Sequence, residues 1–336
     1  MKIAVYGATG YTGRLIVAEL VRRNISTLIL GRNEQDLASI PGPVQRQVAG
    51  LDDIEALSNH LQGCDTVISC VAPFSQFGFY VLEAAILARC NYIDTSGEQR
   101  WIQRVFDEYG PRAAAAGIIC IPSATDDTVT GDLIAGLVAK RLDTLESLVV
   151  HHGFFDVDMS RGTMKSFYAL MQIPPLIWRE GRWVEQASSA LGNVRFPAAE
   201  DEQASFLFPG AELIGIQHHQ AANKMHATVN LDLVSAMTGL NEDVIATLPK
   251  GPAEERRQAA RLTMLVEATS PNGQIVRGYA RGHDLYKLTA VVAVEAAIRC
   301  RDVRGSRGVL APSEAFDAES FLNDLQQFGV DWYIGV

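Results

Sequence analysis

The feature that most constrains the fold is a glycine-rich turn near the start of the 336-residue chain. Apolar residues at 3–7 predict a buried strand, and the periodicity of 11–23 predicts the helix that follows. Between them stand Gly7, Gly10 and Gly13. Glycine permits a tight turn and a close approach of backbone to ligand, while a helix N-terminus presents N–H groups and a positive dipole end. The pattern therefore predicts a dinucleotide-binding turn that holds a pyrophosphate.

Short apolar runs alternate with helical patterns through the first third of the chain. The later runs lie at 27–31, 46–49, 66–71, 92–95 and 118–122, and segments of helical periodicity separate them. Such alternation is typical of parallel strands joined by crossover helices, and strands this apolar are covered on both faces. We therefore expect an α/β fold with a doubly wound, parallel Rossmann sheet.

The pattern changes in the middle of the chain. Residues 145–155 form one long strand-like run. Two alternating segments, 261–269 and 275–282, flank an Asn-Gly pair that supplies the positive φ angles of a hairpin turn. These patterns predict a second domain at 126–282, an inserted α+β unit built on a mixed sheet that serves substrate binding and dimerisation.

Three other segments complete the expected organisation. A further strand is predicted at 226–235, whereas 179–209 has no clean period and is interpreted as loop. An apolar helix at 285–300 is expected to pack back on the first domain. The Rossmann domain is thus predicted to consist of residues 1–125 and 283–336.

Composition excludes several classes of function. The chain has 29 Lys and Arg against 39 Asp and Glu, a formal charge of -10, and no basic patch, so a nucleic-acid partner is not expected. No apolar run approaches the roughly 20 residues of a membrane-spanning helix, so no membrane insertion is expected. The first strand begins at once and leaves no room for a signal peptide, which predicts a cytoplasmic location.

The five cysteines are dispersed and form no C-x-x-C pair, so neither a metal site nor a disulfide framework is expected. Dehydrogenases that form thioesters need a nucleophilic cysteine beside a helix start. Cys120 instead lies within an apolar run. Direct hydride transfer, without covalent catalysis, is the favoured chemistry.

A cation stands where the adenosine ribose should lie. The second strand ends at Gly31, so Arg32 is expected at the strand tip, roughly 20 positions after the last glycine of the turn. A carboxylate there would bind the ribose hydroxyls of NAD, whereas a guanidinium can pair with the 2′-phosphate of NADP. The alternative is a solvated surface arginine. Arg32 favours NADP(H) as the cofactor.

Further cofactor contacts are expected from two loops at the carboxyl ends of the parallel strands, since ligands bind in the crevice outside those ends. Some of these residues could equally serve only to end a strand. The candidates are Thr9, Tyr11 and Thr12 in the glycine turn, and Cys70, Val71, Ala72 and Pro73 after the fourth strand.

These motifs together resemble the saccharopine dehydrogenase-like oxidoreductase family, which includes saccharopine reductases and relatives described as trans-acting enoyl reductases. The resemblance extends over residues 1–140 and is patchy beyond. It implies the Rossmann fold, an NADP cofactor and a homodimer formed through the second domain's sheet, but no particular substrate. The matching segments are Gly7-Ala8-Thr9-Gly10-Tyr11-Thr12-Gly13, Cys70-Val71-Ala72-Pro73-Phe74, Tyr92-Ile93-Asp94-Thr95-Ser96-Gly97-Glu98, Asp127-Thr128-Val129-Thr130-Gly131-Asp132-Leu133, Ser160-Arg161-Gly162-Thr163-Met164-Lys165-Ser166 and Gly308-Val309-Leu310-Ala311-Pro312.

Polar residues after the fifth and sixth strands are candidates for the chemistry. Tyr92 and Glu98 belong to the fifth strand and its loop, and Asp127 comes soon after the sixth strand. Glu98 could relay a proton as a catalytic residue or could complement a helix dipole instead. Tyr92 and Asp127 are predicted to bind substrate. Two of the carboxylates among Asp126, Asp127 and Asp132 are expected to cap a helix.

A helix is predicted to begin at Ser160 and to present a polar face. Arg161, Lys165 and Tyr168 recur on that face at helical spacing. The face is either merely solvated or binds an anionic substrate through Arg161 and delivers a proton from Lys165 or Tyr168. A separate pair, His151 and His152, points to opposite faces of its strand, and each is interpreted as a structural histidine.

The hypothesis that unites these observations is an NADP(H)-dependent oxidoreductase that transfers hydride to a conjugated C=C or a C=N bond of a small-molecule metabolite. The alternative is a non-catalytic NADP(H)-binding regulatory or assembly protein, because a fold does not fix a function. Turnover of NADPH distinguishes the two.

Overall fold

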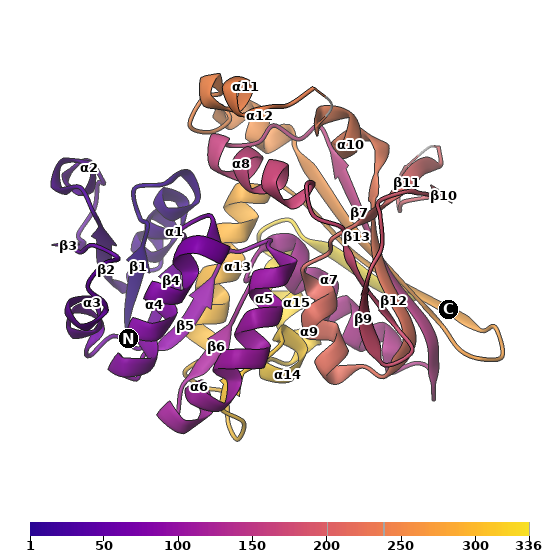
Figure 1. The fold of residues 1–336 in the computed structure, drawn as a ribbon, viewed down its shortest axis with the longest axis horizontal. Helices are drawn as coiled ribbons and strands as arrows, with labels where there is room; N and C mark the ends of the chain where they lie inside the picture. Colours follow the sequence, from indigo (N-terminus) through magenta and orange to yellow (C-terminus); the bar gives the residue numbers. More distant parts are fainter. Residues whose placement is uncertain (200, 238, 336) are drawn as a thin grey trace. The chain divides into compact units, whose positions relative to one another are not determined.

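The structure is a computed structural model that describes residues 1–199, 201–237 and 239–335. The chain forms two compact units (Figure 1). The first contains Met1–Thr125 and Tyr286–Leu310, and the second contains Asp126–Leu285 and the described chain from Ala311 onward. Within this described part, no helix is long and apolar enough to cross a bilayer.

The first unit is built on a seven-stranded sheet in which every strand pairing is parallel, so the predicted α/β Rossmann fold is confirmed. The spatial order is β15-β6-β5-β4-β1-β2-β3. The strands are β1 Lys2–Tyr6, β2 Ser26–Gly31, β3 Gln45–Val48, β4 Thr66–Ser69, β5 Asn91–Asp94, β6 Ile119–Ile121 and β15 Gly308–Val309.

Helices connect these strands and bury their apolar stripes. In α1 the residues Ile16, Val17 and Leu20 are buried at helical spacing, as the amphipathic pattern predicts. The late apolar helix α13 does join this unit, since Ala297 accepts a hydrogen bond from the hydroxyl of Thr66 at 3.3 Å. The helices are α1 Tyr11–Arg22, α2 Glu34–Ala38, α3 Ile54–Leu61, α4 Phe74–Ala88, α5 Gln99–Arg104, a π-helical turn Val105–Tyr109, α6 Gly110–Ala116 and α13 Leu285–Arg299.

The second unit is built on a mixed sheet in the order β10-β11-β12-β7-β13-β14-β16, with the β8–β9 hairpin beside β12. The long central strand β7 pairs in parallel with β12 and antiparallel with β13. The strands are β7 Leu145–Phe155, β8 Leu176–Arg179, β9 Arg182–Glu185, β10 Ala190–Val194, β11 Gln203–Phe208, β12 Ala222–Asn230, β13 Arg261–Thr269, β14 Ile275–His283 and β16 Asp331–Gly335.

One face of this sheet packs against helix α7. Gly278 on β14 makes the close approach possible, because a Cβ there would lie 2.7 Å from Val138 and 3.1 Å from Ile134 of the helix. The helices of the unit are α7 Asp126–Ala139, α8 Arg161–Leu170, α9 Glu212–His219, α10 Leu231–Met237, α11 Glu242–Thr247, α12 Glu254–Ala259, α14 Pro312–Ala315 and α15 Ala318–Gln326.

The hairpin predicted around Asn272-Gly273 is confirmed as β13 and β14, paired along their whole length. Two other expectations are wrong. The supposed loop at 179–209 contains the strands β9, β10 and β11; β9 and β10 are short and mostly exposed, whereas β11 buries Ser205, Leu207 and Phe208. The strand predicted at 226–235 ends at Asn230, where α10 begins. Of the three clustered carboxylates, Asp126 and Asp127 begin α7, whereas Asp132 lies fully buried within it.

The C-terminal segment was assigned to the Rossmann domain from the sequence, but it groups with the second unit. The reason is the strand β16, which pairs antiparallel with β14 from Arg281↔Asp331 to Arg277↔Gly335. Its apolar residues complete the second sheet rather than the first.

Candidate functional site

The glycine turn has the geometry that a cofactor pyrophosphate requires. Gly7 has φ +81°, a conformation that side chains disfavour. A Cβ on Gly13 would lie only 2.3 Å from the Gly7 carbonyl oxygen, so only glycine allows α1 to begin so close to β1. Gly10 is exposed and is the N-cap of α1, with no side-chain cap. The first turn of α1 can therefore receive an anion.

The structure brings the glycine turn and the loop after β4 together. A Cβ on Gly7 would lie 2.9 Å from the Cys70 carbonyl oxygen and 3.2 Å from the Val71 side chain. Val71 and Pro73 are partly exposed, Ala72 is exposed, and the Ala72–Pro73 peptide bond is cis. These residues thus border the turn and present accessible surface, as a cofactor-binding loop must.

Arg32 lies directly after β2, and its side chain is exposed. A second arginine, Arg14 of α1, ties the glycine turn to the end of α2: its Nε donates to the Thr9 carbonyl oxygen at 3.2 Å, and its Nη2 donates to the Ser39 hydroxyl at 2.9 Å. Two guanidinium groups therefore stand at the edge of the turn where the adenosine ribose is expected.

Glu98 caps a helix, but not the one that follows it in sequence. Its carboxylate accepts hydrogen bonds from the backbone N–H groups of Phe74 at 2.6 Å and Ser75 at 2.9 Å, the first residues of α4. Ser96 in turn accepts a hydrogen bond from the Glu98 N–H at 3.0 Å. The carboxylate thus fixes the loop after β5 to the start of α4, beside Pro73.

The structure gives Tyr92 a different place from the predicted substrate contact. Tyr92 is fully buried, and its hydroxyl donates to Asp94 at 2.9 Å. Asp94 also accepts from Trp101 Nε1 at 2.9 Å and from the N–H groups of Ser96 at 3.0 Å and Ser123 at 2.8 Å. A buried carboxylate needs such donors. Tyr92 and Asp94 therefore hold the fifth strand, its loop and the sixth strand together in the core.

The helix predicted from Ser160 is present as α8, and Ser160 caps it by accepting a hydrogen bond from the Thr163 N–H at 3.1 Å. Arg161 donates through Nε to the Leu248 carbonyl oxygen at 2.7 Å. Lys165 is exposed and Tyr168 is partly exposed. Lys165 and Tyr168 therefore present an ammonium and a phenol to solvent. One edge of the Arg161 guanidinium is already hydrogen-bonded to Leu248.

A buried ionisable cluster in the second unit escaped the sequence analysis. His152 Nε2 lies 3.0 Å from Glu212 Oε1, and its Nδ1 lies 4.0 Å from Asp127 Oδ2. The His152 and Glu212 side chains are fully buried, whereas Asp127 is 25% exposed. The aromatic ring of Phe208 packs 5.0 Å from the imidazole. The cluster can hold a proton in the interior and reaches the surface of the unit at Asp127.

Asp132, one of the three clustered carboxylates, forms a second ion pair within this unit. His219 Nε2 lies 2.8 Å from Asp132 Oδ2, and the Ser313 N–H donates to Asp132 Oδ1 at 2.7 Å. This pair cannot be recognised from the sequence, because it joins α7 and α9 across 87 positions. This pair fixes α9 and α14 to α7.

Comparison with known proteins agrees with the geometry of the first unit. Residues 3–121 match the model of the saccharopine dehydrogenase NADP binding domain. A rat protein described as a saccharopine dehydrogenase-like oxidoreductase is 24% identical over 99% of this chain and 97% of its own length. The chain is thus similar to the saccharopine dehydrogenase-like oxidoreductases. Its first unit matches an NADP-binding domain, as the glycine turn predicted.

Other relatives match over part of their length. A Caenorhabditis elegans "lipid droplet localized protein" is 26% identical over 44% of this chain and 39% of its own length, so the match spans about two fifths of that protein. A trans-acting enoyl reductase of Mycobacterium ulcerans is 26% identical over 39% of this chain and 34% of its own length. The fold of the whole chain matches the L-Glu-forming saccharopine dehydrogenase of Saccharomyces cerevisiae, with a TM-score of 0.65 at 12% identity and full coverage of both chains.

Proposed function

We propose that this protein is a member of the saccharopine dehydrogenase-like oxidoreductase family, an NADP(H)-dependent enzyme that transfers hydride to a conjugated C=C or a C=N bond of a small-molecule metabolite. The observation that carries the proposal is the glycine turn. No side chain caps the helix that begins there, Arg14 and Arg32 lie beside the turn, and the residues around it match an NADP-binding domain. The name of the mycobacterial relative, an enoyl reductase, supports the C=C alternative.

The two arginines supply the preference for NADP(H) in this proposal. Arg32 pairs with the 2′-phosphate, since its guanidinium is exposed and follows directly after β2. Arg14 is held at the turn by Thr9 and Ser39, so it adds positive charge at a fixed position. The Gly10 backbone and the first turn of α1 bind the pyrophosphate, with Thr9, Tyr11 and Thr12 beside it.

When bound, the cofactor supplies the hydride. The loop after β4, from Cys70 to Pro73, orients the nicotinamide portion, and Glu98 keeps this loop in place through its bonds to the start of α4. Reduction also needs a proton, for which Lys165 and Tyr168 are the candidate donors on α8. Arg161 orients an anionic substrate group with the N–H groups that Leu248 does not use. Asp127 remains a candidate substrate contact.

The decisive experiment follows NADPH oxidation at 340 nm with a panel of enoyl and imine substrates. Turnover by the wild-type protein, lost in Lys165→Met or Tyr168→Phe, would support the proposal and name the acid. Full activity in both variants would refute their role and direct attention to Glu98 and Asp127. Tight NADPH binding without turnover on any substrate would favour the alternative, a regulatory or assembly protein.

The homodimer and the cytoplasmic location also remain proposals. Sedimentation equilibrium tests the first, and imaging of a tagged full chain in its native cell tests the second. The C. elegans relative's name makes association with lipid droplets the informative contrary outcome for the location.

A further inference from the structure

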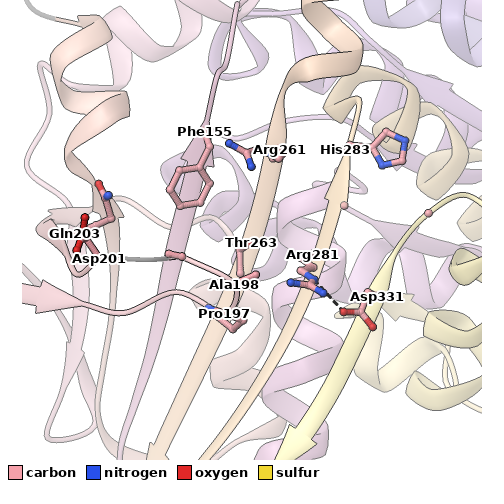
Figure 2. Close-up of a pocket in the computed structure, with 13 residues that line it drawn as sticks. Phe155, Pro197, Ala198, Asp201, Gln203, Arg261, Thr263, Arg281, His283 and Asp331 are labelled. Carbon is pink, nitrogen blue, oxygen red and sulfur yellow. Dashed lines mark hydrogen bonds and ion pairs between the residues drawn. The ribbon is translucent and has the colours of Figure 1, made fainter.

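The second unit carries a groove of about 710 Å³ that no step of the proposed reaction uses (Figure 2). It lies on the face of the mixed sheet that points away from α7, since Met264 meets α7 and its neighbour Thr263 points the other way. The volume is in the range of small-molecule sites. Its lining comes from β7, β13, β14, the start of β16, Gly329 and, from the preceding part of the chain, Pro197, Ala198, Ala199, Asp201 and Gln203.

Strand register places the groove's polar groups in two adjacent rows. In one row Phe155, Arg261 and His283 are direct cross-strand neighbours. In the next row, two residues along, Thr263 stands beside Arg281. Because Arg261 and Arg281 are diagonal neighbours, their Cα atoms are expected about 7–8 Å apart, with the Thr263 hydroxyl between them. Two cations and one hydroxyl therefore belong to one patch of the sheet.

These groups retain hydrogen-bond donors. Arg261 donates through Nη2 to Asp156 at 2.8 Å, and Arg281 donates through Nε to Asp331 at 2.9 Å. Within the described chain, neither the remaining N–H groups of the two arginines nor the Thr263 hydroxyl has a hydrogen-bond partner. Thr263 is only 5% exposed, and its hydroxyl is available to a ligand on the floor of the groove. Each carboxylate orients one arginine and leaves most N–H donors of that arginine available to a ligand.

The apolar part of the groove is built before any ligand arrives. Phe196 is 1% exposed and packs with Leu265 and Val194, in space that the absent side chain of Gly153 provides. This anchor fixes the following turn, in which the Ala199 N–H donates to the Phe196 carbonyl oxygen at 3.0 Å. Pro197, Ala198 and Ala199 thereby line the groove at a fixed position, and ligand binding need not order them.

Ala198 supports the idea that this turn is held in place. Its φ of 63° is in the left-handed region, which is unfavourable for a residue with a Cβ. Such a conformation persists where the surroundings impose it, and it is enriched at ligand-binding sites. Its neighbours on both sides of the turn, Phe196 and Ala199, belong to the apolar cluster of this face.

We propose that this groove binds an amphipathic organic anion, a molecule with a carboxylate or phosphate head and an apolar body. Arg261, Arg281 and Thr263 hold the head, and the apolar body lies against Phe155 and the segment from Pro197 to Ala199. Phe155 also holds Arg261 in place, with the guanidinium carbon 5.8 Å from the ring centroid. The site lies wholly within the second unit and does not depend on the proposed reductase activity.

The test is isothermal titration calorimetry on the full chain without NADPH, at low salt. Octanoate and monooctyl phosphate are the probes, and octan-1-ol and inorganic phosphate report the tail and the head alone. We expect both octyl anions to bind at least tenfold more tightly than either control. The tighter of the two anions then identifies the head group as carboxylate or phosphate.

Variants locate the site. Arg261→Gln and Arg281→Gln should each weaken octyl anion binding by tenfold or more, whereas Asp331→Asn should strengthen it by releasing Arg281. The matched control is Arg277→Gln, because Arg277 lies on the same strand and face but pairs with Glu267 outside the groove. Arg277→Gln should change the affinity for the octyl anions by less than twofold. Circular dichroism verifies that each variant is folded.

Three outcomes would overturn the proposal. The first is that neither octyl anion binds. This includes the case in which a second copy of the chain covers this face of the sheet. The second is an equal loss in Arg277→Gln, which would mean nonspecific attraction to positive charge. The third is equal binding of octan-1-ol, which would leave the arginines without a role. None of these results bears on NADPH oxidation, so this proposal and the reductase proposal fail independently.

Discussion

The imidazole Nε2 of His152 lies 3.0 Å from the carboxylate of Glu212, and both side chains are fully buried. Burial disfavours the charged imidazolium and by itself would lower the pKa of His152. The negative charge and hydrogen bond of Glu212, with the charges of Asp127 and Asp126, outweigh burial and raise the pKa. A central strand of the second unit thus contains a histidine that holds its proton more firmly than a free one.

This relationship predicts how stability depends on pH. A histidine whose pKa is raised on folding contributes stability that is fully present below its unfolded pKa of about 6.5 and is lost as the pH rises through the folded value. Glu212→Gln leaves the buried imidazolium with only the more distant Asp127, 4.0 Å from Nδ1, and should lower the free energy of unfolding by about 3 kcal/mol at pH 6. Urea unfolding from pH 6 to 9 should show this difference shrinking as the pH rises.

The control for this experiment is Glu146→Gln, which removes an exposed pair with Lys224 on the same sheet. It should leave stability unchanged across the series, because exposed pairs are screened by solvent. A Glu212→Gln difference that stays constant or grows with pH would show that His152 is neutral in the folded protein.

Arg32 should set the preference for the cofactor. Its charge-assisted contact with the 2′-phosphate is worth about 1.5–3 kcal/mol, reduced by exposure, so Arg32→Ala should weaken NADPH binding by about tenfold and leave NADH binding unchanged. Fluorescence titration with both cofactors measures this. Arg104→Gln, which removes an exposed arginine paired with Glu108, should leave both affinities as they are. Equal affinity of the wild type for NADPH and NADH would refute the assignment.

Glu98 can be assigned to structure or to chemistry by comparing two substitutions. Glu98→Ala leaves the N–H groups of Phe74 and Ser75 without their acceptor and should lower stability by about 1 kcal/mol. Glu98→Gln keeps one acceptor and should restore most of that stability. If Glu98 only caps α4, then Glu98→Gln retains turnover, whereas a proton relay would lose 10² to 10⁴ fold. Thermal melts and steady-state kinetics on both variants separate the two roles.

Cysteine chemistry should be dispensable. Burial raises the pKa of the Cys70 thiol to about 12, and burial also raises the pKa of Cys120. Neither thiol supplies a thiolate near neutral pH, which a covalent mechanism requires. Cys70→Ser and Cys120→Ser should therefore keep turnover within a few fold. A folded variant without activity would restore the thioester mechanism.

The parts of the fold that the sequence predicted are those with local signals. The turn from Gly7 to Gly13 lies between a strand and a helix that are contiguous with it, and the Asn272-Gly273 hairpin joins neighbouring strands. Each can be recognised within about 20 residues, because the period of the apolar residues and the turn chemistry both act over that range.

The parts that the sequence did not predict depend on pairs far apart in the chain. Glu212 meets His152 across 60 positions, and Glu98 meets Phe74 across 24. Nothing in the residues around either carboxylate distinguishes it from a solvated one. Strand β16 was assigned to the wrong unit for the same reason, since its partner β14 lies some 50 positions earlier. Tertiary pairing, rather than local preference, decides these positions.

Gly13 offers the sharpest test of the cofactor turn. A Cβ at this position would lie 2.3 Å from the Gly7 carbonyl oxygen and 2.9 Å from the Ala8 Cα, so Gly13→Ala must displace either the turn or the start of α1. Backbone cannot move there without changing the N–H groups that would meet the pyrophosphate. We expect at least a hundredfold loss of NADPH affinity, with thermal unfolding showing that the protein still folds.

The matched control for Gly13→Ala is Gly97→Ala. Gly97 lies in the loop after β5, has no neighbouring atom within 4 Å of an added Cβ and does not have a positive φ. The Gly97→Ala variant should bind NADPH with an affinity within twofold of that of the wild type. If Gly13→Ala bound NADPH normally, the pyrophosphate would not rest on this turn. Arg32 would then lose its proposed partner as well, because the position of the 2′-phosphate follows from that of the pyrophosphate.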